Sequence, residues 1–229
     1  MANIKAYDPI GIPEEVASIR KQIRAVLDTR TPDGKTVGGA RFGIYAFFDY
    51  DDEPIYVGQT YESLRSRIGR HLTNQRTDPV AMNVLDPFEV AKIEMWPLWN
   101  LETMDRKDAL PLLNAAEYTV FQLVLKKSSF KAVLNEKDMV PTQIVELPPS
   151  YSGRIIPDSL YNQRKHPDIR IARRATTIAA LARVISERDV SKGLRRTLVT
   201  QARRLQRLAA TRFEEIGGGI PLATPDEQQ

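Results

Sequence analysis

Two short runs of strand-forming residues, 42–49 and 54–58, lie close together in the first quarter of the chain. Both are rich in Ile, Val, Tyr and Phe, the residue types that favour β-strands. The acidic segment between them has the polar composition of a turn, and Pro54 is tolerated because it begins the second run. The pattern therefore predicts a β-hairpin that brings Tyr45 and Tyr56 near each other.

A helix is expected directly after this hairpin, from about Glu62 to Asn74. Its apolar residues recur at four-residue steps, which is typical of a buried helical stripe, at Leu64, Ile68 and Leu72. Arg67 and His71 are also four residues apart, so they share a neighbouring face of the same helix. From that face both side chains can point back toward the hairpin.

These segments, in this order, resemble the GIY-YIG nuclease superfamily. The matching pieces are GIY at 43–45, YVG at 56–58 and the pair Arg67 and His71, followed by a glutamate in a later helix and an asparagine near the end of the domain. We assign the glutamate to Glu117, which precedes an apolar helical run, and the asparagine to Asn135. The resemblance covers about residues 41–140. It implies an α+β fold with a small central antiparallel three-stranded sheet flanked by helices.

The resemblance also implies a chemistry, metal-dependent hydrolysis of phosphodiester bonds. Glu117 would bind one Mg²⁺ or Mn²⁺, with waters and phosphate oxygens as the other ligands. Arg67 would clamp the scissile phosphate, and Asn135 would hold a metal-bound water or the phosphate in place. Tyr45 or Tyr56 would orient and deprotonate the attacking water, with His71 relaying the proton. The spacing does not decide between the two phenols.

One position departs from the family pattern. Some members carry a lysine directly after the YIG motif, where it is thought to lower the pKa of the tyrosine. This chain has Gln59 there instead. The role of that cation would therefore fall to His71.

Several residues compete for the assigned roles. For the metal-binding glutamate, the alternatives to Glu117 are Glu89, Glu94 and Glu102. Glu94 falls in a strand expected over residues 89–96, where alternation would turn its side chain to solvent. Asn114 competes with Asn135, which also follows two apolar residues and would be suited to ending a strand or starting a turn.

The C-terminal third of the chain is strongly basic. Residues 151–216 contain 15 Lys or Arg and 6 Asp or Glu, whereas the whole chain has a net charge of only +4. Two helices are expected there, one ending near Arg188 and one from about Ser191, a plausible N-cap, to Ile216. The alternative to a phosphate-binding surface is an ordinary solvated helix face. The predicted nucleic-acid contacts are Arg65, Arg70, Arg173, Arg174, Arg195, Arg196, Arg203 and Arg204.

Breaks in composition divide the chain into five regions. They are an N-terminal helical extension (1–40), the nuclease domain (41–140), a Pro-containing connector (141–167), a basic helical region (168–216) and a flexible tail (217–229). The extension would hold an amphipathic helix from about Pro13 to Leu27, and the connector would be an extended loop. The last long helix carries an apolar stripe that would pack on the core or form a homodimer interface, at Leu194, Leu198, Ala202, Leu205 and Ala209.

Composition narrows the chemistry further. The chain has no cysteine, which excludes disulfides, thiolate catalysis and cysteine-bound zinc, and its two histidines are too few for a multi-histidine metal site. It has no run of eighteen apolar residues and no signal-peptide pattern, so a cytoplasmic protein without a membrane partner is expected. We therefore predict a DNA endonuclease, acting on double-stranded DNA in restriction or phage defence. The alternatives are a homing or repair nuclease and, from another class, a DNA-binding module that does not cut.

Overall fold

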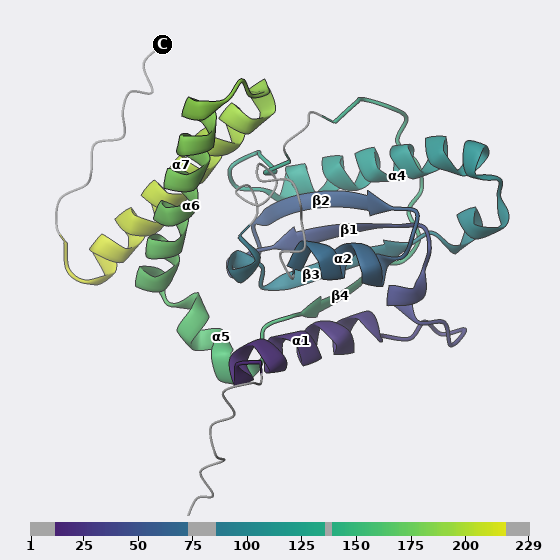
Figure 1. Cartoon of the computed structure of the whole chain (residues 1–229), viewed down its shortest axis with the longest axis horizontal. Helices are drawn as coiled ribbons and strands as arrows, with labels where there is room; N and C mark the ends of the chain where they lie inside the picture. Colours follow the sequence, from purple (N-terminus) through teal and green to yellow (C-terminus); the bar gives the residue numbers. More distant parts are fainter. Residues whose placement is uncertain (1–11, 73–85, 136–138, 219–229) are drawn as a thin grey trace, which may run out of the picture.

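A computed structural model describes residues 12–72, 86–135 and 139–218 of the chain. They form the α+β fold that was expected, a central antiparallel sheet with helices on both faces (Figure 1). The sheet has four strands in the order β2-β1-β3-β4: β1 Gly43–Phe48, β2 Pro54–Thr60, β3 Lys92–Pro97 and β4 Tyr151–Arg154. Short 3₁₀ turns lie between the main elements: η1 Val37–Gly39, η2 Pro87–Glu89 and η3 Trp99–Thr103.

Strands β1 and β2 form the predicted hairpin. Tyr45 pairs with Gly58 and Phe47 with Tyr56, and the register shifts after Phe47. Since alternate residues of a strand face opposite sides of the sheet, this register puts the rings of Tyr45, Phe47 and Tyr56 on one face. The ring centroids of the two tyrosines are 6.1 Å apart. The hairpin therefore brings the two phenols together as the sequence predicted.

The fourth strand comes from the predicted connector. Residues of β4 pair antiparallel with β3, with Gly153 opposite Ile93. A Cβ added at Gly153 would lie 2.8 Å from Cγ2 of Val26 in α1 (Glu14–Leu27), the helix predicted for the N-terminal extension. The prediction of three strands was thus one short, because the four residues Tyr-Ser-Gly-Arg lack the apolar alternation that marks a strand.

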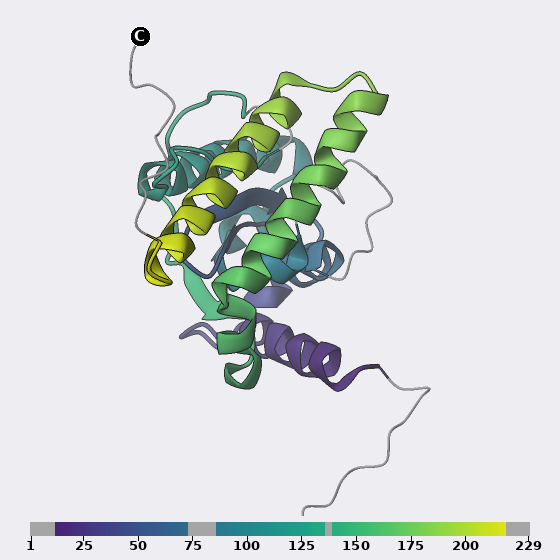
Figure 2. The ribbon, with the colours of Figure 1, turned by 90° about the vertical axis from the view of Figure 1, so that its left-hand side faces the viewer.

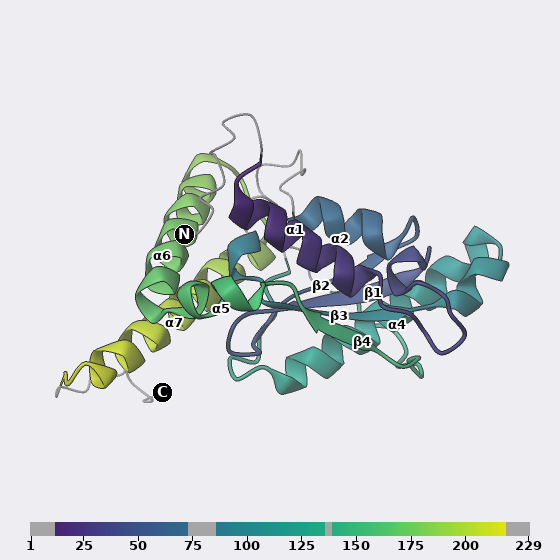
Figure 3. The same ribbon diagram turned by 90° about the horizontal axis from the view of Figure 1, so that it is seen from below.

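Helices cover the two faces of the sheet differently. The face that carries Ile44 and Val57 packs against α4 (Arg106–Lys127). The opposite face, which carries Tyr45, packs against α1 and against α2 (Leu64–Leu72), the helix predicted after the hairpin. Figure 3 shows α1 and α2 on one side of the sheet and α4 on the other. The last two residues of the predicted helix, 73 and 74, lie outside the described residues.

Three helices follow β4: α5 Asp158–Lys165, α6 Pro167–Glu187 and α7 Lys192–Glu215. Figure 2 shows α6 and α7 side by side as a helical hairpin. Ser191 caps α7 as predicted, since its Oγ accepts the backbone N–H of Leu194 at 3.3 Å. Leu194 is buried in the core that contains Tyr45, and Leu198 packs against it. These two residues of the predicted stripe therefore pack on the chain's own core.

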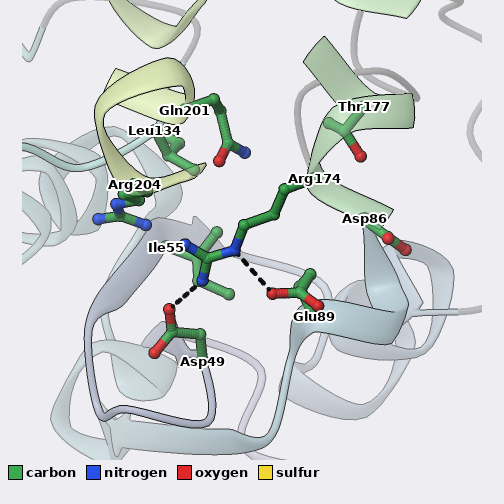
Figure 4. A pocket seen from close by; sticks show the side chains of 9 residues that line it. All are labelled: Asp49, Ile55, Asp86, Glu89, Leu134, Arg174, Thr177, Gln201 and Arg204. Atoms are coloured by element: carbon green, nitrogen blue, oxygen red, sulfur yellow. Dashed lines mark hydrogen bonds and ion pairs between the residues drawn. The ribbon is translucent and has the colours of Figure 1, made fainter. Parts of the chain in front are cut away.

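A buried ionic cluster joins α6 to the tip of the hairpin. Arg174 donates to Oδ2 of Asp49 at 2.8 Å and to Oε2 of Glu89 at 3.1 Å (Figure 4). Arg170, one turn earlier, lies 2.7 Å from Oδ2 of Asp51 and 3.4 Å from Oδ2 of Asp49. Asp49 and Asp51 belong to the acidic turn between β1 and β2. The turn is thus charge-compensated by helix α6, and the cluster places α6 against the hairpin.

Helix α7 contributes to the same cluster through Arg204. Its Nη2 donates to the backbone oxygen of Pro54 at 2.8 Å and to Oε2 of Glu53 at 3.4 Å. Arg174 and Arg204 are only 6% and 2% exposed. The prediction that these two arginines contact nucleic acid is therefore wrong, because carboxylates and carbonyls of this chain already surround their guanidinium groups.

The regions outside residues 41–140 are less sharply separated from one another than the sequence predicted. The predicted connector contains β4 and α5, and α6 and α7 share ion pairs with the hairpin. Most of the predicted tail, residues 219–229, lies outside the described residues. No helix within the described parts of the chain is long and apolar enough to cross a membrane.

Candidate active site

The close packing of the two phenols depends on Gly58. A Cβ added there would lie 2.5 Å from Oη of Tyr45 and 2.7 Å from Cε1 of Tyr56, far inside normal contact distances. Only a residue without a side chain lets both rings occupy this face of the sheet. This explains in physical terms why a glycine follows Tyr-Val in this motif.

Helix α2 brings an imidazole to the phenols. His71 is 3% exposed, and its Nε2 lies 3.2 Å from Oη of Tyr45. The imidazole ring is also 5.2 Å from the ring of Tyr56, between centroids. The buried stripe of Leu64 and Ile68 fixes this helix on the sheet, and His71 lies beside that stripe. The predicted grouping of two phenols and one imidazole is therefore present.

Arg67 lies one turn before His71 on the same helix and faces the same phenols. Burial opposes its charge, but interactions with Tyr45 and then Tyr56 outweigh that effect and raise the pKa of Arg67. The structure records no ion pair between Arg67 and a carboxylate within the residues it describes. Its positive charge is thus directed at the tyrosines and is available to an anion bound beside them.

The two neighbouring arginines of α2 behave differently. Arg65 pairs with Asp28, and Arg70 forms a two-pronged ion pair with Glu62. The side chains of both arginines are more than a third exposed. Exposed ion pairs of this kind contribute little to stability, so the pairs can be exchanged for phosphate at small cost. Both residues keep their predicted role as proposed nucleic-acid contacts.

Glu117 of α4 reaches the site around the outer edge of β2. Burial is the main influence on this carboxyl and raises its pKa to about 7. The nearby charge of Arg67 and the backbone N–H of Gln59 partly oppose that rise. Both influences require the carboxylate to lie close to the end of β2 and to Arg67. The charge of Arg67 in α2 therefore acts on Glu117 in α4, although α2 and α4 cover opposite faces of the sheet.

The edge of β2 is also where Asn135 lies. Its Oδ1 accepts the backbone N–H of Val57 at 3.1 Å, and its Nδ2 donates to the backbone oxygen of Val57 at 2.8 Å. One step earlier, the N–H of Leu134 donates to the oxygen of Ile55 at 2.8 Å. The amide of Asn135 thus acts like a neighbouring strand. The sequence predicted a catalytic role for Asn135. In the structure, both polar atoms of its side-chain amide instead bind the backbone of Val57, the residue next to Tyr56.

Comparison with known families bears on this site directly. Residues 41–109 match the family model of the GIY-YIG catalytic domain. The chain carries a GIY-YIG domain. Searches of curated proteins and of solved structures returned no match. The domain supports a nuclease-type function in general terms. Since the matched residues include Tyr45, Tyr56, Arg67 and His71 but end before Glu117, the assignment of Glu117 rests on geometry.

The competing acids of the GIY-YIG domain are engaged elsewhere. Glu89 forms an ion pair with Arg174, while Oε1 of Glu94 accepts a hydrogen bond from Oγ of Ser150 at 2.8 Å. Glu102 accepts the backbone N–H of residue 41 at 2.7 Å. Glu117, by contrast, interacts electrostatically with Arg67. The geometry therefore favours Glu117 among the four candidates.

The donor set fits a divalent cation held mainly by one carboxylate. Among the described residues, no three acidic or histidine side chains gather into a metal site. The raised pKa of Glu117 indicates a carboxylate whose negative charge is poorly compensated where it is buried. A hard cation that keeps most of its water ligands needs few protein oxygens, as Mg²⁺ does. Glu117 thus suits a Mg²⁺ or Mn²⁺ ion better than a zinc ion.

Beyond the GIY-YIG domain, the solvent side of α7 is lined with cations. With helical spacing, its exposed basic residues are Lys192, Arg195, Arg196, Arg203 and Arg207. The acidic residues of this helix, Glu214 and Glu215, come only in its last turn. The remaining predicted contact, Arg173 of α6, is half-buried, and its guanidinium carbon lies 4.4 Å from the ring centroid of Phe88.

Sequence reasoning missed two features that support the site. One is the buried arginine cluster. Its signals in the sequence are the i, i+4 spacing of Arg170 and Arg174 and the acidic composition of the hairpin turn. The other is a hydrogen bond from Nε2 of Gln59 to Oδ1 of Asn114 at 2.8 Å. Asn114 was considered only as a rival to Asn135, and nothing in the sequence pairs it with Gln59.

Proposed function

We propose that this chain is a metal-dependent endonuclease that hydrolyses phosphodiester bonds of double-stranded DNA. The observation that carries the proposal is that Arg67 interacts with the phenols of Tyr45 and Tyr56, and that its charge also acts on the carboxylate of Glu117. A guanidinium near two phenols and one carboxylate is suited to binding a phosphodiester. Its positive charge would stabilise the negative charge that develops on the phosphate oxygens in the transition state.

Arg67 would bind the non-bridging oxygens of the scissile phosphate. Its planar, permanently charged fork matches two phosphate oxygens at once, which a lysine would not. Glu117 would hold Mg²⁺ or Mn²⁺, and the ion would supply neutralisation of charge on the phosphate. Because burial raises the pKa of Glu117 to about 7, the carboxylate is available to a cation chiefly above neutral pH.

Tyr45 is our proposed base. Its Oη lies within hydrogen-bond distance of Nε2 of His71, so a neutral imidazole can accept the phenol proton while Oη takes a proton from the attacking water. The water oxygen forms a bond to phosphorus, the bond to the 3′ oxygen breaks, and the leaving oxygen takes up a proton from solvent while His71 releases its extra proton to solvent. Tyr56, the more exposed phenol, would orient the water or the phosphate.

The exposed cations of α7 would bind the DNA backbone. Arg195, Arg196 and Arg203 lie on its solvent side, where a phosphate chain can release counterions on binding. The buried ion pairs of Arg174 in α6 and Arg204 in α7 fix these two helices to the hairpin that bears the phenols. A GIY-YIG domain followed by basic helices is suited to an enzyme of restriction or phage defence.

The decisive experiment is cleavage of plasmid DNA by the purified full chain. With Mg²⁺ or Mn²⁺ we expect nicked or linear DNA, and with EDTA no product. Glu117→Ala should abolish cutting while DNA binding in a gel-shift assay survives. Glu94→Ala, which changes a competing carboxylate on β3, is the matched control and should cut like the wild type. Absence of cutting on double- and single-stranded DNA, or cutting by Glu117→Ala at the wild-type rate, would refute the proposal.

A further inference from the structure

The side chain of Gln59 lies against α4 beside the proposed metal ligand. Its backbone N–H interacts with the Glu117 carboxylate, and its Nε2 donates to Oδ1 of Asn114 at 2.8 Å. Asn114 and Glu117 are three residues apart on α4, which places them one turn apart on neighbouring parts of the helix surface. Gln59 is therefore joined to α4 twice, through its backbone to Glu117 and through its side chain to Asn114.

The carbonyl end of this amide is unsatisfied. Oε1 of Gln59 is buried and has no hydrogen-bond partner within the described structure. Leaving such a buried acceptor without a partner is unfavourable, because nothing replaces the water it has lost. The bond to Asn114 also fixes which way the amide faces, since it occupies the Nε2 end. A buried oxygen with a fixed direction thus belongs to the residue whose backbone N–H interacts with the Glu117 carboxylate, and a cation bound between the two side chains would satisfy both.

We infer that Oε1 of Gln59 is a second protein oxygen for the divalent cation held by Glu117. This inference rests on the proposed function, because it concerns the same site. Amide carbonyl oxygens suit Mg²⁺ and Mn²⁺ as ligands, and a neutral ligand adds no charge beside a carboxylate that is already half-buried. It also accounts for a site in which the described acidic and histidine side chains form no group of three.

The test is Mn²⁺ binding to the full chain without DNA, measured at pH 8 by the electron paramagnetic resonance signal of free Mn²⁺. Gln59→Leu removes the oxygen and keeps the size of the side chain, so we expect Mn²⁺ affinity to fall about tenfold or more. Gln59→Glu keeps an oxygen and adds charge, and it should bind at least as tightly as the wild type. Gln122→Leu, the same change at a glutamine of α4, is the matched control and should bind like the wild type.

A parallel titration of Glu117→Gln separates the two proposals. If Glu117→Gln loses Mn²⁺ binding while Gln59→Leu binds like the wild type, the role of Gln59 is overturned and the proposed nuclease site stands. If Glu117→Gln binds Mn²⁺ like the wild type, the metal site of the proposed function itself fails. Should Gln59→Leu not fold, as judged by circular dichroism, weaker binding by a folded Gln59→Glu would equally overturn the inference.

Discussion

Oη of Tyr45 and Nε2 of His71 lie 3.2 Å apart in the interior of the molecule, between the sheet and α2. Tyr45 is fully buried and His71 is 3% exposed. A buried phenol normally needs a hydrogen-bond partner, and a carbonyl or a water would serve for packing alone. An imidazole differs from both because it can take up the phenol proton near neutral pH. The pairing therefore links a structural contact to proton transfer.

Removing that proton acceptor should slow cutting without preventing DNA binding. For His71→Ala we expect single-turnover cleavage about 10²–10⁴-fold slower, the usual contribution of general acid–base catalysis. The control is His166→Ala, which changes the only other histidine, an exposed residue at the start of α6. It should cut at the wild-type rate. Equal losses in the two variants would contradict a specific role for His71.

Gly58 offers a test of the packing of the phenols. Gly58→Ala would push a Cβ to within 2.7 Å or less of both tyrosine rings, so one or both phenols must move. We expect the cleavage rate to fall by about 10²-fold, as misplacement of catalytic groups by about 1 Å does in general. Gly69→Ala on α2, where an added Cβ meets nothing within 4 Å, is the control. It should cut normally and be more stable by up to about 1 kcal/mol. Normal cutting by Gly58→Ala would show that the phenol positions are unimportant.

The carboxyl of Glu117 should leave a signature in the pH dependence of stability. Burial raises its pKa from 4.5 to about 7, so between these values the folded chain holds a proton that the unfolded chain has lost. Stability from this group is therefore lost as pH rises through that window, by at most about 3 kcal/mol. Glu117→Gln cannot ionise, so its stability relative to the wild type should increase from pH 4.5 to pH 8.

Urea unfolding of both proteins at several pH values, without metal, measures this difference. Comparing wild type with variant cancels the titration of all other groups. A difference that stays constant from pH 4.5 to pH 8 would mean that the carboxyl titrates normally. Addition of Mg²⁺ at pH 8 should stabilise the wild type and leave Glu117→Gln unchanged, since a ligand stabilises only the form that binds it.

Local patterns were sufficient to predict the elements that carry the site. Alternation located the hairpin of Tyr45 and Tyr56, and the four-residue repeat located α2 with Arg67 and His71. These are short-range signals, since each depends on residues within about ten positions of one another. The placement of Asn135 was not predictable in this way. Its partner Val57 is 78 residues away, and the sequence does not reveal that an edge strand needs this amide.

The arginines of α6 and α7 show the same limit. Adjacent residues on a helix point about 100° apart, so one side chain of a pair can face outward while its neighbour is buried. Arg203 is exposed and Arg204 is buried, but composition alone treats them alike. The two arginines differ because Arg204 binds Glu53 in the acidic turn of the hairpin. Glu53 lies 151 residues before Arg204 in the sequence. Charge counting found the basic region and could not divide it into surface and interior.

Arg204 should therefore matter for stability. Arg204→Met leaves the carboxylate of Glu53 without its buried cation and the oxygen of Pro54 without a donor. Breaking a buried ion pair from one side costs about 3–5 kcal/mol, whereas an exposed substitution costs less than about 0.5 kcal/mol. Urea unfolding should show the large loss for Arg204→Met and almost none for the neighbouring Arg203→Met. Similar losses for both would contradict the burial of Arg204.

Arg203 should matter for DNA binding instead. If it contacts one phosphate of B-form DNA, the slope of log affinity against log salt concentration should become shallower by about 0.9 in Arg203→Met. The triple change of Arg195, Arg196 and Arg203 to Met should lower the slope by up to about three times that amount. Fluorescence anisotropy with a labelled duplex, in EDTA to prevent cutting, measures these slopes. An unchanged slope in the triple variant would remove α7 from the DNA-binding surface, while leaving the chemistry at Tyr45, Arg67 and Glu117 intact.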